Sequence, residues 1–276
     1  MSIDYKIVAT DLDGTLFNTS IEVSKENLAA IQEMDRRGVH FVPSSGRAYT
    51  EIPDKVLKIP EARYVICADG ATVYDQKTKK IICSTNMNKE LSKLVLDMLY
   101  EYQTLLTVRY EGLAYVDEKL HDWDLYDEYR LTGNYKKFIY DFDRPTPDFK
   151  QFCYDLPSIE MICVFFKSNR EMAECKKRLL ETGRVQVASS EPYNLEVFDI
   201  NAGKGNSLLK LADYLGVDRA ATIGVGDSLN DMDNIRKAGL GLAMENACEA
   251  LKVEANRIIC NNDEHAMKYI LENFIK

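Results

Sequence analysis

The sequence predicts an α/β protein with a parallel sheet that is interrupted by an inserted α+β domain. Strands and helices alternate at short intervals near both ends of the chain, which is typical of a parallel sheet. Between about residues 84 and 188 this alternation gives way to short alternating strands and to aromatic, acidic segments. At 276 residues, the chain is also longer than a usual single domain. We therefore expect a core of residues 1–83 and 189–276 and an inserted domain of residues 84–188.

The first predicted strand, residues 7–10, is apolar and is followed by Asp11, Asp13 and Gly14. Alternation along an extended chain puts the two carboxylates on one side, and the glycine permits a sharp turn. Ligands of open α/β sheets bind at this end of the strands. The pair could hold Mg²⁺, or one carboxylate could attack phosphorus. An ordinary acidic turn would have the same composition.

The first part of the core is expected to alternate strands and helices in a fixed order. The elements are a helix capped by Ser24 and ended by Gly38, a strand at 39–42, a helix at 51–58, a strand at 64–67 and a hairpin at 72–83. The second part resumes this order after the inserted domain. Its elements are a strand at 195–198, a helix that ends at Gly216, and strands at 221–225, 239–244 and 257–260.

The inserted domain is expected to contain amphipathic helices and a largely antiparallel sheet. Its elements are a helix near 91–99, strands at 105–108, 113–116 and 160–166, a helix from 169 to 182 and a strand at 185–187. Its polar and aromatic side chains suit sugar recognition, the candidates being Arg109, Tyr110, His121, Trp123 and Tyr126. Because the interior or surface of such a domain would contain the same residue types, we do not count them as site residues.

Composition limits the classes of partner. The net charge of −9 argues against nucleic acid or an anionic membrane as the main ligand. No apolar segment approaches the ~20 residues that span a bilayer, and no secretory signal is visible. The seven cysteines form no CxxC pair and lie mostly in apolar runs. We therefore expect reduced thiols and a cytoplasmic protein, either a monomer or a dimer.

Four predicted core strands are followed by polar residues that together form a chemical inventory. These residues are Asp11 and Asp13, Ser45 and Gly46, Lys204, and Asp227 with Asn230 and Asp231. Alone, each group also suits a turn, a solvated lysine or a helix cap. Together they supply a nucleophile, a proton donor, a hydroxyl group, a cation and a metal clamp.

These motifs resemble those of the haloacid dehalogenase superfamily of aspartate-dependent phosphatases, and within it the Cof-type, subclass IIB, sugar-phosphatase-like hydrolases. The resemblance covers essentially the whole chain. The DxDGT motif is Asp11-Leu12-Asp13-Gly14-Thr15, the TGR motif is Ser45-Gly46-Arg47, the lysine motif is Gly203-Lys204-Gly205, and the GDxxND motif is Gly226-Asp227-Ser228-Leu229-Asn230-Asp231. The resemblance implies a Rossmann-like three-layer core and a type IIB cap inserted between the second and third motifs.

The resemblance also implies a Mg²⁺-dependent phosphatase that hydrolyses small phosphomonoesters, sugar phosphates above all, through an aspartyl-phosphate. Asp11 would be the nucleophile and Asp13 the proton donor. The implied metal site consists of Asp11, the backbone carbonyl of Asp13, Asp227 and Asp231. The implied phosphate site consists of Ser45, Gly46, Lys204 and Asn230. The partner would thus be a small phosphorylated metabolite.

Two residues depart from the family pattern. Ser45 replaces threonine and keeps the hydroxyl donor, whereas Asp69 replaces the usual asparagine and adds a carboxylate that would repel phosphate.

Three other functions use similar residues. A sugar phosphomutase or a pyrophosphatase could use the same site, and a phospho-accepting signalling module also places acids, a hydroxyl and a lysine around Mg²⁺.

Overall fold

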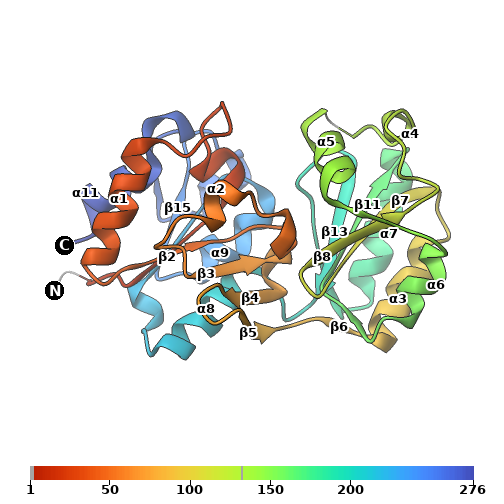
Figure 1. Ribbon diagram of the computed structural model, residues 1–276, viewed down its shortest axis with the longest axis horizontal. Coiled ribbons are helices and arrows are strands. Elements are labelled where there is room, and N and C mark those ends of the chain that lie inside the picture. Colours follow the sequence, from red (N-terminus) through yellow and green to blue (C-terminus); the bar gives the residue numbers. More distant parts are fainter. Residues whose placement is uncertain (1–2, 132) are drawn as a thin grey trace. The chain divides into compact units, whose positions relative to one another are not determined.

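The computed structural model describes residues 3–131 and 133–276, which divide into two compact units (Figure 1). The core unit contains the residues up to Gly46, together with Ile52–Ser84 and Gly203–Lys276. The inserted unit contains Arg47–Glu51 and Thr85–Ala202. The predicted mixed α/β architecture with a parallel central sheet is confirmed.

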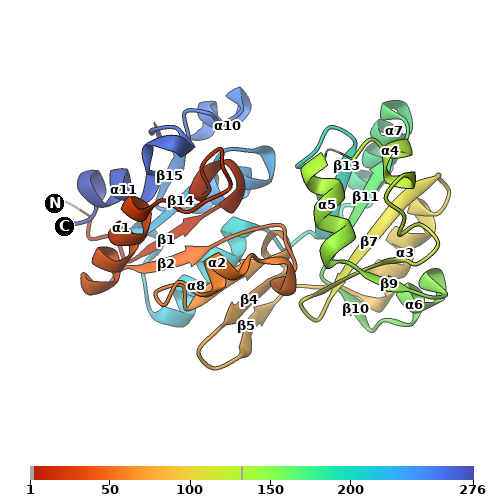
Figure 2. The same ribbon diagram turned by 45° about the horizontal axis from the view of Figure 1, so that its top comes forward.

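The core unit is built on a five-stranded parallel sheet in the order β16-β15-β14-β1-β2 (Figure 2). Its strands are β1 (Ile7–Thr10), β2 (His40–Pro43), β14 (Thr222–Gly226), β15 (Leu240–Ala243) and β16 (Arg257–Ile258). β2 pairs with β1 on one side. On the other side of β1 lie β14, β15 and β16, in that order and later in the chain. The strand order therefore reverses between β1 and β14, and ligands of open α/β sheets bind at such a reversal.

Helices cover both faces of this sheet. They are α1 (Lys25–Arg36), α2 (Asp54–Leu57), α8 (Lys204–Leu215), α9 (Met232–Lys237), α10 (Glu249–Glu254) and α11 (Ala266–Phe274). The first and last of the long helices, α1 and α11, lie side by side, and α8 lies on the other side of the sheet (Figures 1 and 2). Leu208 and Leu211 of α8 pack with Ile7 and Ala9 of β1. The core unit thus has the expected three layers.

Local chemistry explains where these helices begin and end. The Ser24 hydroxyl accepts a hydrogen bond from the backbone N–H of Asn27 at 3.1 Å and caps α1, as predicted. Gly216 follows α8 in a left-handed conformation that is typical of helix C-termini. A three-stranded antiparallel sheet, β3 (Tyr64–Cys67), β4 (Thr72–Asp75) and β5 (Lys80–Ser84), adjoins the core sheet through a bridge from Ser44 to Ile66.

The inserted unit contains a six-stranded sheet in the order β12-β13-β11-β7-β8-β9. Its strands are β7 (Thr104–Tyr110), β8 (Leu113–Asp117), β9 (Arg144–Thr146), β11 (Met161–Phe166), β12 (Val185–Ala188) and β13 (Asn194–Asp199), and β6 (Met87–Asn88) pairs separately with β10 (Ser158–Ile159). Its helices are α3 (Lys89–Leu99), α4 (Leu125–Glu128), α5 (Gly133–Phe142), α6 (Phe149–Asp155) and α7 (Asn169–Glu181). Apolar side chains of α3, α6 and α7 form one core with the sheet.

The boundaries of the inserted unit differ from the predicted limits of 84–188. The strand at 195–198, expected in the parallel core, is β13, and it pairs antiparallel with both β11 and β12. The unit therefore extends to Ala202 and also includes Arg47–Glu51. The predicted strand, Leu195-Glu196-Val197-Phe198, has the composition of a strand in either sheet, so composition alone placed it in the wrong unit.

The described residues include no helix with both the length and the apolar character needed to cross a membrane. The cysteines at positions 67, 83, 153, 163, 175, 248 and 260 are all free thiols. Burial raises the pKa of the Cys163 thiol to about 12, so this thiol stays protonated at neutral pH.

A buried ion pair lies inside the inserted unit. The guanidinium of Arg109, on β7, lies 3.3 Å from Glu51 and also donates to the hydroxyl of Thr107. The side chains of Arg109 and Glu51 are almost completely buried. Burial and the neighbouring Glu51 raise the pKa of Asp143, a further buried acid. Arg109, a candidate for substrate contact in the sequence, instead compensates buried carboxylates, and Tyr126 is likewise fully buried.

We expect Arg109→Met to lower the free energy of unfolding by about 3–5 kcal/mol, because it leaves Glu51 buried without its cation. Urea denaturation measures this change. The matched control is Arg144→Met, at an exposed position of the same sheet, which should change the stability by less than ~0.5 kcal/mol. Equal stability of the two variants would show that the buried pair is dispensable.

Candidate active site

Two adjacent strands bring the first and last acidic motifs together. Asp11 directly follows β1, and Asp227 directly follows β14, its parallel neighbour. The backbone N–H of Asp11 donates to the carbonyl of Val225 at 3.1 Å, which continues the strand pairing to the edge of the sheet. The two carboxylates therefore lie where the strand order reverses, at the carboxyl ends of the strands.

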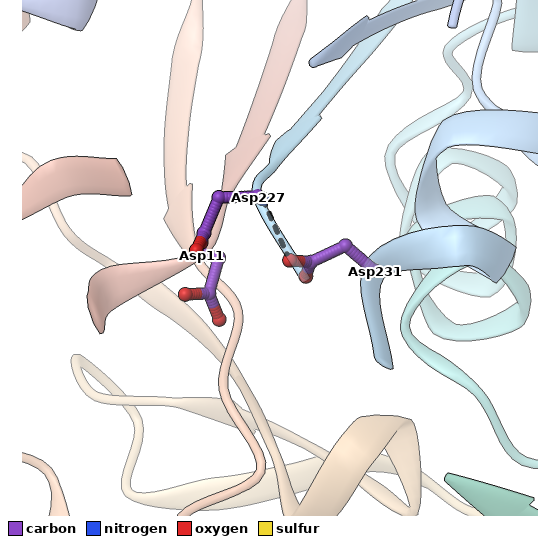
Figure 3. Close-up of side chains that lie close together, drawn as sticks. All are labelled: Asp11, Asp227 and Asp231. Carbon is purple, nitrogen blue, oxygen red and sulfur yellow. Dashed lines mark hydrogen bonds between the residues drawn. The ribbon is translucent and has the colours of Figure 1, made fainter. Parts of the chain in front are cut away.

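Asp231 completes a group of three carboxylates with Asp11 and Asp227 (Figure 3). Each offers an oxygen, and these oxygens all lie within 4.8 Å of one another. Asp231 is held rigidly, because its Oδ2 accepts hydrogen bonds from the backbone N–H groups of Asp227 at 3.0 Å and Ser228 at 3.2 Å. The turn between β14 and α9 thus fixes the third carboxylate.

Lys204 joins two of these acids. Its Nζ donates to Oδ1 of Asp11 at 2.7 Å and to Oδ1 of Asp231 at 2.6 Å, and its side chain is completely buried. The lysine is the first residue of α8. Although burial lowers the pKa of Lys204, the nearby carboxylates of Asp11 and Asp231 raise it well above its ordinary value. The group is therefore a permanent positive charge.

The acids carry more negative charge than this lysine can balance. Burial raises the pKa of Asp11, with the opposing effect of Lys204 outweighed by burial and the other acids. Burial and Asp231 raise the pKa of Asp227 to about 7. If all three carboxylates were ionised beside the one ammonium group, the cluster would have an excess of two negative charges. A divalent cation with a preference for oxygen ligands would balance that excess, so the donor set fits Mg²⁺.

Asp13 lies apart from the three-carboxylate group. Its side chain is exposed, and its backbone is extended within the turn Leu12–Leu16. Its charge nevertheless contributes to the raised pKa values of Asp11 and Asp227, so the carboxylate is near them. The next residue, Gly14, has φ +73°, and a Cβ there would lie 2.5 Å from Oδ2 of Asp227. Only glycine lets the chain turn so close to this acid.

The predicted phosphate ligands Ser45 and Gly46 follow β2 in the core unit. Ser45 is buried, and its backbone N–H donates to the carbonyl of Ile66 at 2.9 Å. A Cβ on Gly46 would approach the carboxylate of Asp69 to 3.1 Å. Asp69 also accepts a hydrogen bond from the amide of Asn230 at 3.3 Å. The backbone N–H of Asp69 donates to the carbonyl of Ser45 at 3.2 Å, so Asp69 connects Ser45 with Asn230 and lies close to Gly46.

Two hydroxyl groups orient side chains of the site and had no role assigned from the sequence. Thr15 donates its hydroxyl to Oδ1 of Asp227 at 2.9 Å. Ser228 donates its hydroxyl to Oδ1 of Asn230 at 2.6 Å, which orients that amide. Both lie within the matched motifs, so their positions were evident while their partners were not. Arg47, by contrast, lies in the inserted unit with its guanidinium 4.2 Å from the ring centre of Phe138.

The site geometry agrees with the family that the chain matches. Residues 8–271 match the model of the haloacid dehalogenase-like hydrolases. The chain belongs to this family. It is 28% identical to the phosphatase YwpJ of Bacillus subtilis, over 98% of this chain and all of the relative. It is also 28% identical to the 5-amino-6-(5-phospho-D-ribitylamino)uracil phosphatase YwtE of B. subtilis, over 98% of each chain.

Solved structures agree with the fold. A haloacid dehalogenase-like hydrolase from B. subtilis has a TM-score of 0.84 and 27% identity, over 98% of this chain and 100% of the other. A subclass IIB sugar phosphatase has a TM-score of 0.81 at 19% identity, over 98% of each chain, and shows the same fold. The family match and the relatives that are named phosphatases make the chain a phosphatase of the haloacid dehalogenase-like family, and the solved structures agree with its fold.

The raised pKa of Asp227 predicts a pH-dependent stability in the absence of divalent cations. Between the ordinary value of 3.8 and about 7, the folded chain holds a proton on Asp227 that the unfolded chain has released. Raising the pH through this interval therefore favours unfolding. Thermal melting with a chelator should show a Tm difference between Asp227→Asn and the unsubstituted protein that grows as the pH rises from about 5 to about 8.

Comparison with the variant is needed because two histidines act in the opposite direction. Burial lowers the pKa of His40 and of His121, which stabilises the folded chain as the pH rises. These contributions are the same in both proteins and cancel in the difference. A Tm difference that is constant across the pH range would contradict the assigned environment of Asp227.

Proposed function

We propose that the chain is a Mg²⁺-dependent phosphatase that hydrolyses small phosphomonoesters, preferably sugar phosphates, through an aspartyl-phosphate on Asp11. The observation that carries the proposal is the buried contact of Lys204 with Asp11 and Asp231 beside Asp227. In this proposal, the contact brings together the nucleophile, a fixed positive charge and a site for a divalent cation at the carboxyl ends of the strands.

The metal would be held by the carboxylates of Asp11 and Asp227, with Asp231 orienting its water ligands and the backbone carbonyl of Asp13 as a further donor. When bound, Mg²⁺ supplies positive charge that stabilises the transferring phosphoryl group. It would also lower the pKa values of the acids that bind it, so that Asp11 is ionised and nucleophilic at neutral pH.

In the first step, a carboxylate oxygen of Asp11 attacks phosphorus in line with the leaving oxygen. Because Oδ1 accepts the hydrogen bond of Lys204, Oδ2 is the attacking atom in this proposal. The bond between phosphorus and the substrate oxygen breaks, and the departing oxygen takes a proton from Asp13. The product is an aspartyl-phosphate and a free alcohol, and one difficult displacement has become two easier ones.

In the second step, water attacks the phosphorus of the aspartyl-phosphate and loses a proton to Asp13. The bond between phosphorus and the Asp11 oxygen breaks, which releases inorganic phosphate and restores both acids. Asp13 suits both proton transfers because its side chain is exposed and not part of the three-carboxylate group. The positive charge of Lys204 stabilises the negative charge of the phosphoryl oxygens in both steps.

Ser45, the backbone at Gly46 and Asn230 would hold the remaining phosphoryl oxygens. The Asn230 amide is already oriented, because Ser228 donates to its oxygen and its nitrogen donates to Asp69. Preorganised donors of this kind stabilise developing charge without reorganising during the reaction.

Two relatives support phosphorylated sugars or sugar alcohols as the substrate class. YwtE and YcsE of B. subtilis, at 28% and 25% identity, are named for a substrate with a phosphate on a ribityl chain. We place the reaction in the cytoplasm, where the free thiols of the chain would stay reduced.

We expect the protein to release inorganic phosphate from a panel of sugar phosphates, nucleotides and phosphorylated cofactors, with the sugar phosphates fastest. Release should require Mg²⁺, stop with a chelator and be abolished in Asp11→Asn, whose circular dichroism should match that of the unsubstituted protein. The variant keeps the size of the side chain and removes the nucleophile. Turnover by the purified Asp11→Asn variant would overturn the nucleophile assignment.

Product analysis in the same assay separates the other functions. Movement of the phosphoryl group to another position of a hexose phosphate would indicate a phosphomutase. Release from pyrophosphate alone would indicate a pyrophosphatase, and a stable phosphorylated protein without turnover would indicate a signalling module.

We expect Asp13→Asn to slow turnover by about 10²–10⁴-fold, because an amide can neither donate the proton to the leaving alcohol nor accept one from water. Steady-state kinetics on the best sugar phosphate measures the loss. If Asp13 instead served only to bind substrate, KM would rise while kcat stayed the same.

A further inference from the structure

Three side chains near the C-terminus hold the loop that carries Asp13. Asn246 lies after β15, and Asn262 and Asp263 lie in the turn before α11. They contact the segment from Gly14 to Thr19, which begins directly after Asp13 and ends in a tight turn at residues 18–22. The loop and the three side chains all belong to the core unit.

All three side chains are hydrogen-bonded to the loop, and Asn246 is also bonded to Asn262. Asn246 donates to the carbonyl of Gly14 at 2.8 Å and accepts from the backbone N–H of Asn262 at 3.0 Å. Asn262 donates to the carbonyl of Phe17 at 3.0 Å. Asp263 accepts both from the backbone N–H of Thr19, at 2.9 Å, and from its hydroxyl, at 2.6 Å. Three side chains thus hold the loop at Gly14, Phe17 and Thr19.

The loop also has backbone hydrogen bonds of its own. Asp13 is extended and Gly14 is left-handed within the turn Leu12–Leu16, and the N–H groups of Leu16 and Phe17 donate across them to the carbonyls of Asp11 at 3.2 Å and Leu12 at 2.8 Å. Phe17 is buried, but Asp13 and Thr19 are exposed. The contacts of Asn246, Asn262 and Asp263 thus hold the part of the loop that directly follows Asp13.

The hydrogen bonds suit a function at neutral pH. Bonds from Thr19 hold the pKa of Asp263 below its ordinary value, so this carboxylate remains an acceptor. Asn246 and Asn262 do not titrate. These contacts are hence intact across the pH range in which the catalytic acids change charge.

We propose that Asn246, Asn262 and Asp263 are positioning residues that hold Asp13 in place for proton transfer to the leaving group. The inference rests on the proposed function, since it assigns a use to Asp13. These residues touch neither the three carboxylates nor Lys204 through any described hydrogen bond, and they act only through the loop backbone.

The role predicts a dependence on the leaving group. An alkyl oxygen, as in ribose 5-phosphate, must be protonated as it departs, whereas the nitrophenolate of p-nitrophenyl phosphate departs readily without a proton. Since kcat/KM covers only the steps up to formation of the aspartyl-phosphate, the comparison isolates the first proton transfer. Misplacing Asp13 should therefore lower kcat/KM for ribose 5-phosphate far more than kcat/KM for p-nitrophenyl phosphate.

The test uses the double variant Asn246→Ala/Asp263→Ala of the full chain. We expect kcat/KM for ribose 5-phosphate to fall about 10-fold or more, with a change of less than about 3-fold for p-nitrophenyl phosphate. Amide hydrogen exchange in the peptide containing residues 14–19 should become faster. Thr19→Ser, which keeps both groups that bind Asp263, should retain the ratio of the two substrates found in the unsubstituted protein.

The matched control is Arg37→Ala. Arg37 donates to the carbonyl of Ile275 at 3.3 Å and so also fastens the C-terminal segment, but to α1 rather than to the Asp13 loop. This variant should leave the substrate ratio unchanged.

Two results with the double variant would overturn the positioning role: equal losses of kcat/KM on both substrates, or no loss despite faster amide exchange. Either result would leave the proposed function standing as long as the unsubstituted protein shows Asp11-dependent phosphate release. Absence of that release would overturn the proposed function and this inference together.

Discussion

The contact of Lys204 with Asp11 and Asp231 is the interaction on which the site depends. A fully buried ammonium group is costly to desolvate, and only well-placed carboxylates offset that cost. Asp11 and Asp231 are costly to bury for the same reason. The lysine begins α8, Asp11 directly follows β1, and Asp231 ends the turn before α9. One cation therefore ties three elements of the core unit together at the edge of the sheet.

The topology determines why these residues meet. Lys204 and Asp11 are 193 residues apart in the chain, with the whole inserted unit between them. The chain leaves the sheet after one half has formed and returns to add β14 beside β1. Because both strands are parallel, their carboxyl ends coincide. The pairing of β1 with β14 thus places Asp11 beside Asp227 despite the long insertion between them.

Much of this arrangement could be predicted from the sequence, because apolar strands followed by acids are local patterns. Asp11, Asp227, Asp231 and Lys204 were predicted to converge and do so. The limits of the inserted domain were wrong, since pairing of β13 depends on strands far away in the chain. The role of Asn246, Asn262 and Asp263 could not be predicted, because no sequence pattern distinguishes them from other polar residues in loops. Only their contacts in the structure do so.

Asp69, which stands where the family pattern has asparagine, has a different effect in the structure from the one its charge suggests. As an added carboxylate near phosphate, it would be expected to repel the ligand. It is nevertheless buried, it accepts from the Asn230 amide, and its charge helps to raise the pKa of Lys204. An asparagine oxygen could accept the same hydrogen bond but would not supply the charge. The substitution thus preserves the orientation of Asn230 and adds negative charge near Lys204.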